Sequence, residues 1–238
     1  TQAMTERRFT RADLDLLRRW DTPTICNALE LVAPARRGRG FTLQPFTVAD
    51  PSLPPICGLA RTGQIRAAAP SGRSREQDRE ARIGWYDYVA DADLPTIVVI
   101  EDLDEAPGVG AFWGEVNSAI HKGLGCQGCV TSGSFRDIDM LATGFQIIGG
   151  MVNPSHAHVH MVDFGRDVIV HGMPVMHDDV VHADRHGAVV IPADAVRQLP
   201  AAIDLIARRE AVILDMAKRD DFTIETLKQA LSRADEIH

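Results

Sequence analysis

The segment Gly133-Ser134-Phe135-Arg136-Asp137 contains the residue types with the clearest chemical potential in this chain. The pattern predicts a strand that enters a glycine turn, followed by a short helix over 136–143, with Gly144 as its C-cap. The first N–H groups of a helix are unpaired and attract anions. Arg136 adds a planar fork for a carboxylate or enolate oxygen, and Asp137 is a hard oxygen ligand for Mg²⁺ or Mn²⁺. The segment could therefore hold a metal beside an α-keto acid, unless it is a surface pair in which Asp137 caps the helix.

A second candidate is Trp113-Gly114-Glu115-Val116-Asn117, at the start of a helix predicted over 114–124. The amides of Gly114 to Asn117 form another set of free N–H groups. The Glu115 carboxylate repels an anion but could hold a water molecule on a metal. The alternative is an ordinary helix N-terminus with a favourable Glu in its first turn. We expect both corners to lie at helix starts in neighbouring βα units, the edge where open α/β sheets bind ligands.

Histidines alternate in His156-Ala157-His158-Val159-His160, within a strand predicted over 156–164. Alternate residues of a strand share one face, and two histidines at i and i+2 can chelate zinc. Asp163 lies on the opposite face by parity, which disfavours a compact site. The alternatives are a polar strand face or a subunit interface. A second set with the same logic follows a later strand and consists of His182, Asp184 and His186.

Cysteine usage does not predict a disulfide framework, because four cysteines are too few for a chain of this length. Cys126 and Cys129 form an isolated CxxC within an apolar strand. Core packing is the favoured interpretation for both side chains.

The elements that must position these residues follow from the periodicity of apolar residues and from the cap residues. Strands are predicted over 56–67, 96–100, 126–131 and 145–148, a helix over 72–90, and consecutive β-structure over 156–192; the end is helical over roughly 193–218, broken near Pro200, and over 223–235. We therefore predict one α/β domain over 1–238, with a core of about 20–192, N-terminal helices over 10–32 and C-terminal helices over 193–235.

Composition excludes several classes of protein. The chain has 238 residues, of which 45% are apolar and 24% charged, so it is neither disordered, nor collagen-like, nor a coiled coil. No apolar run approaches the roughly 18 residues that span a bilayer. The formal charge is 25 − 33 = −8 and there is no basic block, so direct nucleic-acid binding is not expected. No secretory signal opens the sequence, and we expect a cytoplasmic protein.

Lysine is scarce. The 25 basic residues are 22 Arg and 3 Lys, namely Lys122, Lys218 and Lys228. Schiff-base chemistry needs a lysine, whereas arginine binds carboxylates. Lys122 lies two turns after Glu115 on a similar helix face, so imine chemistry at Lys122 is the rival to metal chemistry at Asp137.

Three segments, taken in order, resemble the RraA-like family, which includes the 4-hydroxy-4-methyl-2-oxoglutarate aldolases. The family pattern is a Gly-acid step, a glycine turn that ends in Arg-Asp, and a late strand pair around a turn before Val-Val-Pro. The matching segments are Trp113-Gly114-Glu115, Gly125 through Asp139, and Asp178 through Pro192, with weaker matches at Thr22–Leu31 and Gly58–Thr62. The resemblance covers roughly 20–210. Asn117 stands where an apolar residue is usual, and the loop before Trp113 and the extra aromatic helix indicate a divergent subgroup.

The resemblance implies a swivelling ββα sandwich that assembles into trimers or hexamers, with sites at subunit interfaces. It implies metal-dependent retro-aldol cleavage of 4-hydroxy-2-oxo (di)carboxylates to pyruvate, with possible decarboxylation of oxaloacetate. By position, Asp137 is the metal ligand and Arg136 binds the keto acid. The amides of Gly114 to Asn117 bind its carboxylate, and Glu115 orients waters on the metal. Glu210 is the weak match for a carboxylate that comes from a neighbouring subunit's C-terminal helix.

The expected mechanism follows from the charge that the reaction creates. Cleaving a C–C bond beside a 2-keto group leaves an enolate, which a Lewis-acidic metal and Arg136 would stabilise. The second class of function is a non-catalytic regulator, because some RraA-like proteins bind and inhibit RNase E and a shared fold does not settle function. An acidic surface suits binding to a basic, RNA-binding region of such a partner.

Overall fold

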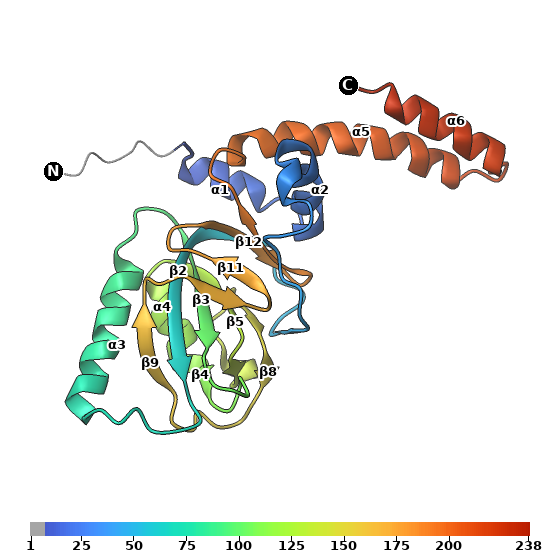
Figure 1. Cartoon of the computed structure of the whole chain (residues 1–238). Helices are drawn as coiled ribbons and strands as arrows, with labels where there is room; N and C mark the ends of the chain where they lie inside the picture. Colours follow the sequence, from blue (N-terminus) through green and yellow to red (C-terminus); the bar gives the residue numbers. More distant parts are fainter. Residues whose placement is uncertain (1–7) are drawn as a thin grey trace.

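The computed structural model describes residues 8–238, which form a mixed α/β body with helices added at both ends (Figure 1). The main sheet has the order β1-β7-β5-β3-β2-β12-β13, with β9 paired to β2. Its strands are β1 (Thr47–Val48), β2 (Ile56–Arg66), β3 (Thr96–Asp102), β5 (Cys126–Thr131), β7 (Gln146–Gly149), β9 (His160–Phe164), β12 (Val180–Asp184) and β13 (Gly187–Ile191). Among residues 8–238, no helix is both long and apolar enough to cross a membrane.

The centre of the main sheet is parallel: β2 pairs with β3, β3 with β5, and β5 with β7. Parallel strands are covered on both faces and consist of continuous apolar runs. Thr96–Ile100 is such a run, and the side chains of Ile97 to Ile100 are fully buried. β2 is longer than its neighbours, so its first half pairs with β12 and its second half with β9. The predicted strands over 56–67, 96–100 and 126–131 are therefore confirmed.

Beside the main sheet lie a three-stranded parallel sheet, β4-β6-β8, and a hairpin of β10 and β11. The short strands are β4 (Ala111–Trp113), β6 (Ser134–Phe135), β8 (Met151–Val152), β10 (Val168–Val170) and β11 (Met173–Val175). Trp113 on β4 stands opposite Phe135 on β6. Because the two strands are parallel and end in register, the residues that follow them emerge side by side.

The helices are α1 (Arg11–Leu17), α2 (Thr22–Val32), α3 (Arg75–Ala90), α4 (Glu115–Gly123), α5 (Leu199–Ala217) and α6 (Ile224–Asp235), with single 3₁₀ turns η1 (Pro34–Arg36), η2 (Ile138–Met140) and η3 (Val196–Gln198). Ser74, Asp21 and Thr223 are N-caps whose side chains accept backbone N–H bonds, as their residue types predict. Figure 1 shows α1, α2 and α5 at one end of the body and α3 along its side. The α5–α6 arm points away from the sheets.

Three local predictions are wrong. The helix expected over 136–143 is only the 3₁₀ turn Ile138–Met140, preceded by extended β6 and by Asp137 in a left-handed conformation. The strand expected over 156–164 begins only at His160, because residues before it turn at Ala157, whose φ is 45°. Pro200 does not break the C-terminal helix; it occupies the first turn of α5, where its missing N–H costs nothing.

Candidate active site

Two chain segments meet where β4 and β6 end. The Arg136 N–H donates to the carbonyl of Trp113 at 2.9 Å, which extends the pairing of the two strands by one residue. α4 begins directly after β4, with Gly114 as its N-cap. The two candidate corners therefore lie side by side as predicted, but in the small sheet rather than at the edge of the main one, and only one of them begins a helix.

Asp137 lies against the start of α4. Its φ of 57° and ψ of 42° are left-handed, a conformation that Asp tolerates better than most residues. Its Oδ2 accepts a hydrogen bond from the backbone N–H of Glu115 at 3.1 Å. The carboxylate approaches so closely that a Cβ on Gly114 would lie 2.5 Å from Oδ2. A glycine is thus required at 114 by the position of the Asp137 side chain.

Asp137 Oδ1 has no hydrogen-bond partner within residues 8–238. The Val116 and Asn117 N–H groups also make no hydrogen bond with this part of the chain, as expected in the first turn of a helix. A helix start carries partial positive charge, which attracts the Asp137 carboxylate. The two remaining N–H groups could bind a second anion.

Arg136 is held along the same edge. Its Nη1 donates to the carbonyl of Pro154 at 3.3 Å, and its Nε lies 3.8 Å from Asp137 Oδ2. The side chain is 35% exposed, so this ion pair is partly screened by solvent. The guanidinium retains N–H donors for a ligand while the contact with Pro154 orients it.

A cavity of about 570 Å³ opens at this junction. Its walls include the predicted residues Gly114, Val116, Asn117, Arg136 and Asp137, together with Arg82, Tyr86, Ala111, Phe112, Trp113, Ile120, His156 and Val159. Glu115 contributes its backbone N–H to Asp137, but its exposed side chain is not part of the walls. One chain therefore assembles five of the six residues predicted for the local site around one cavity.

Sequence reasoning missed the contribution of α3 to this cavity. The Tyr86 hydroxyl donates to Asn117 Oδ1 at 3.1 Å, and Asn117 Nδ2 donates to the carbonyl of Phe112 at 2.6 Å. Asn117 thereby connects α3, α4 and β4 behind the cavity. Arg82 and Tyr86 are four residues apart, hence on one face of α3. This spacing was the signal available in the sequence, but nothing there indicated which face meets α4.

A buried histidine supports α4 from inside. His121 is fully buried, and its Nε2 accepts from Trp85 Nε1 at 2.9 Å. Its Nδ1 must then carry the proton that is donated to the Asn117 carbonyl at 2.7 Å. Burial lowers the pKa of His121 to about 4, so the ring is neutral at physiological pH. The sequence offered no indication of this role for His121.

Two residues considered in the sequence lie elsewhere. Lys122, at the C-terminal end of α4, donates its ammonium to the carbonyl of Thr143 and does not line the cavity. Glu210 is an exposed residue of α5, which Figure 1 shows far from β4. Within one chain, neither side chain lines the cavity at the Arg136–Asp137 corner.

The histidine set at 156–160 does not share a strand face, because Ala157 forms a turn. His156 Nδ1 meets the Ala157 carbonyl at 3.3 Å and His160 Nδ1 meets the His158 carbonyl at 2.7 Å. Throughout residues 8–238, no three His, Cys, Asp or Glu side chains gather into a metal-binding cluster. His156 nevertheless lines the cavity.

The second histidine set is structural. His182 is fully buried and contacts Thr22 Oγ1 at 2.9 Å and the Leu17 carbonyl at 3.1 Å. Asp184 accepts the N–H groups of Thr22 and His186. These contacts fix α1 and α2 against β12.

The CxxC cysteines are free and packed in the core, as predicted. Burial raises the pKa of Cys126 to about 11 and raises the pKa of Cys129 well above its usual value. Both therefore remain thiols rather than reactive thiolates.

The chemistry of the donor groups at the corner fits a hard divalent cation. Mg²⁺ commonly binds through one or two carboxylates and retains several waters. Asp137 offers one oxygen without a hydrogen-bond partner among residues 8–238, at the wall of the cavity of about 570 Å³. Asp137 would hold such an ion, and the metal would be the group that polarises a bound keto oxygen.

The sequence model of the RraA-like family, described as Aldolase/RraA, matches residues 22–190. No curated protein is similar enough in sequence to match the chain. Three solved structures are similar in fold. RraAS2 of Streptomyces coelicolor, described as an unusual member of the RNase ES inhibitor RraA protein family, has 22% identity and a TM-score of 0.66, with 89% of this chain and 98% of that one covered. An uncharacterized protein from Pseudomonas syringae pv. tomato has 18% identity and a TM-score of 0.66, with coverage of 93% and 98%.

The third structure is described as one of the novel cellulases from microbes associated with the gut ecosystem. It has 13% identity and a TM-score of 0.70, with coverage of 88% and 90%. At these identities the three structures show a common fold and nothing about activity.

Proposed function

This chain belongs to the RraA-like family, Aldolase/RraA, and on that premise we propose that it is a divalent-metal-dependent carbon–carbon lyase. The proposed reaction is cleavage of 4-hydroxy-2-oxo (di)carboxylates to pyruvate, with decarboxylation of oxaloacetate as a second activity. One observation carries the proposal: Asp137 has an oxygen without a hydrogen-bond partner in the described part of the chain, at the wall of a cavity that it shares with Arg136 and the start of α4. The metal is Mg²⁺ or Mn²⁺, which supplies Lewis-acid chemistry.

The chain's own residues would bind the two ends of the keto-acid group. The N–H groups of Val116 and Asn117, which are unpaired within residues 8–238, would bind the carboxylate at the positive end of α4. Arg136, oriented by Pro154, donates to the keto oxygen. Asp137 is the proposed metal ligand; its Oδ2 accepts from the Glu115 N–H at 3.1 Å and lies 3.8 Å from Arg136 Nε.

The bond changes follow from this placement. The C3–C4 bond of the substrate breaks, the C4 hydroxyl loses its proton and becomes a carbonyl, and the electron pair passes to the keto oxygen as an enolate. Arg136 stabilises that negative charge. Protonation at C3 then gives pyruvate. With oxaloacetate the same C3–C4 bond breaks and carbon dioxide leaves instead. Glu115, next to the ligand Asp137, is proposed to orient the waters that carry protons at this edge.

The testing experiment compares Asp137→Asn with Lys122→Ala. In Asp137→Asn, we expect pyruvate release to fall on the order of 10²–10³-fold. We also expect the loss of Mn²⁺ binding, as measured by calorimetry. Lys122→Ala should retain both, because its ammonium bonds to Thr143 outside the cavity. Chelation by EDTA should abolish activity, and Mg²⁺ or Mn²⁺ should restore it. If Lys122→Ala were inactive while Asp137→Asn was active, an imine mechanism would replace the metal one.

A protein-binding regulator of RNase E is the alternative function. The observation that favours it is the fold shared with Streptomyces coelicolor RraAS2, together with the net charge of −8. Absence of pyruvate release from 2-oxo dicarboxylates in the presence of Mg²⁺ or Mn²⁺, combined with inhibition of RNase E by the purified protein, would establish the regulator.

We also propose assembly into a homo-trimer or hexamer. The projecting α5–α6 arm exposes apolar side chains, with Leu214 52% and Ile224 56% accessible, and such patches mark interaction surfaces. Glu210 on this arm is proposed to reach the site of a neighbouring subunit. Light scattering should give a mass of three or six chains; a monomer would exclude any role for Glu210 in the site.

A further inference from the structure

The cavity beside Asp137 has a charge opposite to that of the whole protein. The chain is acidic, with a formal charge of −8. The charged side chains in the cavity walls are nevertheless two arginines, Arg82 and Arg136, and one carboxylate, Asp137. By contrast, a cavity of about 700 Å³ near β10 and β11 is lined by two arginines and four carboxylates. A positive cavity in an acidic protein attracts an anion.

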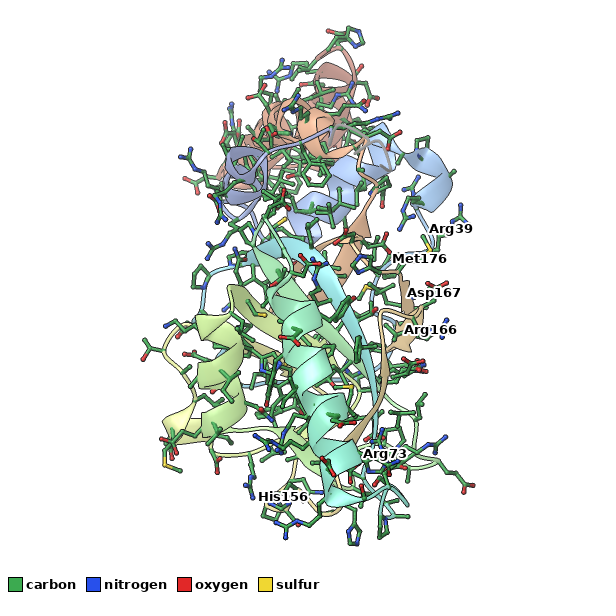
Figure 2. The ribbon with its side chains drawn as sticks, turned by 90° about the vertical axis from the view of Figure 1, so that its left-hand side faces the viewer. Arg39, Arg73, His156, Arg166, Asp167 and Met176 are labelled. Carbon is green, nitrogen blue, oxygen red and sulfur yellow. The ribbon has the colours of Figure 1, made fainter. Side chains whose placement is uncertain are left out.

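A second cavity of about 640 Å³ adjoins the first. The two share five wall residues, namely Arg82, Phe112, Asn117, His156 and Val159. Figure 2 shows the labelled His156 and Arg73 near the N-terminal end of α3. The space beside Asp137 is therefore extended toward α3, and it can accept a ligand longer than the keto-acid group that Arg136 binds.

Arg82 differs from the other arginines of these cavities. Arg73 is occupied, because it bonds to Asp78 at 2.8 Å and to the Met161 carbonyl. Arg136 is bonded to Pro154 and adjoins Asp137. Arg82 is exposed and makes no hydrogen bond or ion pair with any residue from 8 to 238. All five of its N–H donors are available to a ligand.

The position of Arg82 is fixed by its helix. It lies one turn before Tyr86 on the same face of α3, and the Tyr86–Asn117 hydrogen bond joins that face to the first turns of α4. The α3 face that carries Arg82 is therefore held at the wall of the cavity that Arg136 and Asp137 also line. A planar guanidinium at this place matches a carboxylate better than any neutral group.

We propose that Arg82 is a specificity-determining residue that binds the carboxylate remote from the keto group, and so selects 2-oxo dicarboxylates over 2-oxo monocarboxylates. This inference rests on the proposed keto-acid site at Arg136 and Asp137. It adds a residue from α3, which carries none of the three motifs that resemble the family, and it assigns discrimination between substrates to that residue.

Calorimetric titration of the full-length protein in Mg²⁺ tests the proposal with two ligands of equal length. 2-Oxoglutarate carries the remote carboxylate, and 2-oxopentanoate has a methyl group in its place. We expect Arg82→Ala to weaken 2-oxoglutarate binding about 10–100-fold, the loss of one charge-assisted bidentate contact, and to leave 2-oxopentanoate within about twofold. Arg82→Lys should give an intermediate loss, because lysine keeps the charge without the fork.

Arg79→Ala is the matched control. Arg79 lies on the same helix, is exposed, and is not a wall residue of either cavity. It removes the same charge, and we expect both ligands to bind as they do to the unchanged protein. If Arg79→Ala and Arg82→Ala weakened 2-oxoglutarate binding equally, general electrostatics would explain the effect, and the proposal would be overturned.

The outcomes separate this proposal from the proposed reaction. Selective binding of 2-oxoglutarate through Arg82 without pyruvate release from any hydroxy-oxo acid would support the Arg82 role and refute the lyase. Pyruvate release with no change of ligand preference in Arg82→Ala would support the lyase and refute the Arg82 role. Failure of the unchanged protein to bind either ligand would refute both.

Discussion

Oδ2 of Asp137 lies 3.1 Å from the backbone nitrogen of Glu115, although the two residues are 22 positions apart in the chain. The contact exists because β4 and β6 are parallel neighbours that end in register. It turns Asp137 toward the positive end of α4, and no residue from 8 to 238 bonds to its Oδ1. The candidate metal ligand is thus positioned by a helix start rather than by other ligands.

Gly114→Ala should displace the Asp137 carboxylate while the fold remains intact. The new Cβ would lie 2.5 Å from Oδ2, closer than nonbonded atoms allow, and the side chain must move. Because Asp137 is the proposed ligand, we expect Mn²⁺ affinity and pyruvate release to fall at least about tenfold, as for other misplaced site groups. Circular dichroism should show unchanged secondary structure.

Gly123→Ala is the control for that substitution. Gly123 ends the same helix, and a Cβ there meets nothing within 4 Å. We expect unchanged activity and a small gain in stability, since alanine favours helix by about 1 kcal/mol over glycine. Equal loss of metal affinity in both variants would show that helix stability, and not contact with Asp137, is responsible.

Tyr86→Phe should impair the site through Asn117. It removes the hydrogen bond to Asn117 Oδ1, and that half-buried oxygen loses its partner, at a cost of about 1–3 kcal/mol. We expect kcat/KM to fall while Mn²⁺ affinity is retained, because Asp137 is untouched. Chemical denaturation and steady-state kinetics measure the two effects.

Tyr88→Phe provides a comparison of similar stability cost away from the site. The Tyr88 hydroxyl accepts the Thr62 N–H at 3.1 Å and contacts His177 Nδ1 at 2.8 Å, and Tyr88 lines neither cavity beside Asp137. In this variant, any loss of activity should be explained by the loss of stability alone. A kcat/KM loss equal to that of Tyr86→Phe would argue against a positioning role for Asn117.

Stability should fall when the pH drops below about 6.5. Burial lowers the pKa of both His121 and His182 to about 4. In the unfolded chain these rings bind a proton near pH 6.5, so between about 6.5 and 4 the unfolded state binds more protons than the native state. The two histidines therefore leave the free energy of unfolding unchanged above pH 7. On acidification they lower it, by up to about 3 kcal/mol for each histidine.

Urea denaturation at pH 7.5, 6.0 and 5.0 measures this loss. His182→Gln should be less stable than the unchanged protein at pH 7.5, since the contacts with Thr22 and Leu17 are altered, but its stability should depend less on pH. The same pH dependence in both proteins would mean that His182 is not the titrating group.

Much of the fold, and the two corners of the site, follow from local sequence. The cap residue Thr223 predicts where α6 begins, although the helix predicted from residue 72 begins only at Arg75, and the continuous apolar run of β3 predicts a buried strand. Glycine next to an acid marks the start of α4, and Arg136-Asp137 after a glycine turn marks the other corner. These signals are local, because each depends on hydrogen bonds or packing within a few residues.

The tertiary structure alone decided the rest. The residues after Phe135 have helix-compatible types, yet they form one 3₁₀ turn, because the Arg136 N–H pairs with Trp113 and Asp137 turns left-handed toward Glu115. Likewise, the alternation of histidines at 156–160 suits a strand, but a turn at Ala157 places His156 at the cavity.

Arg82 and Tyr86 show that local sequence also cannot predict which residues meet at the site. Their spacing shows that they share a face of α3, but only the packing of α3 against α4 determines that this face meets Asn117. The sequence by itself therefore determined which residues could do chemistry at the two corners. The contacts between β4, β6, α3 and α4 decided which of them meet, because such contacts depend on the three-dimensional course of chain segments far apart in sequence.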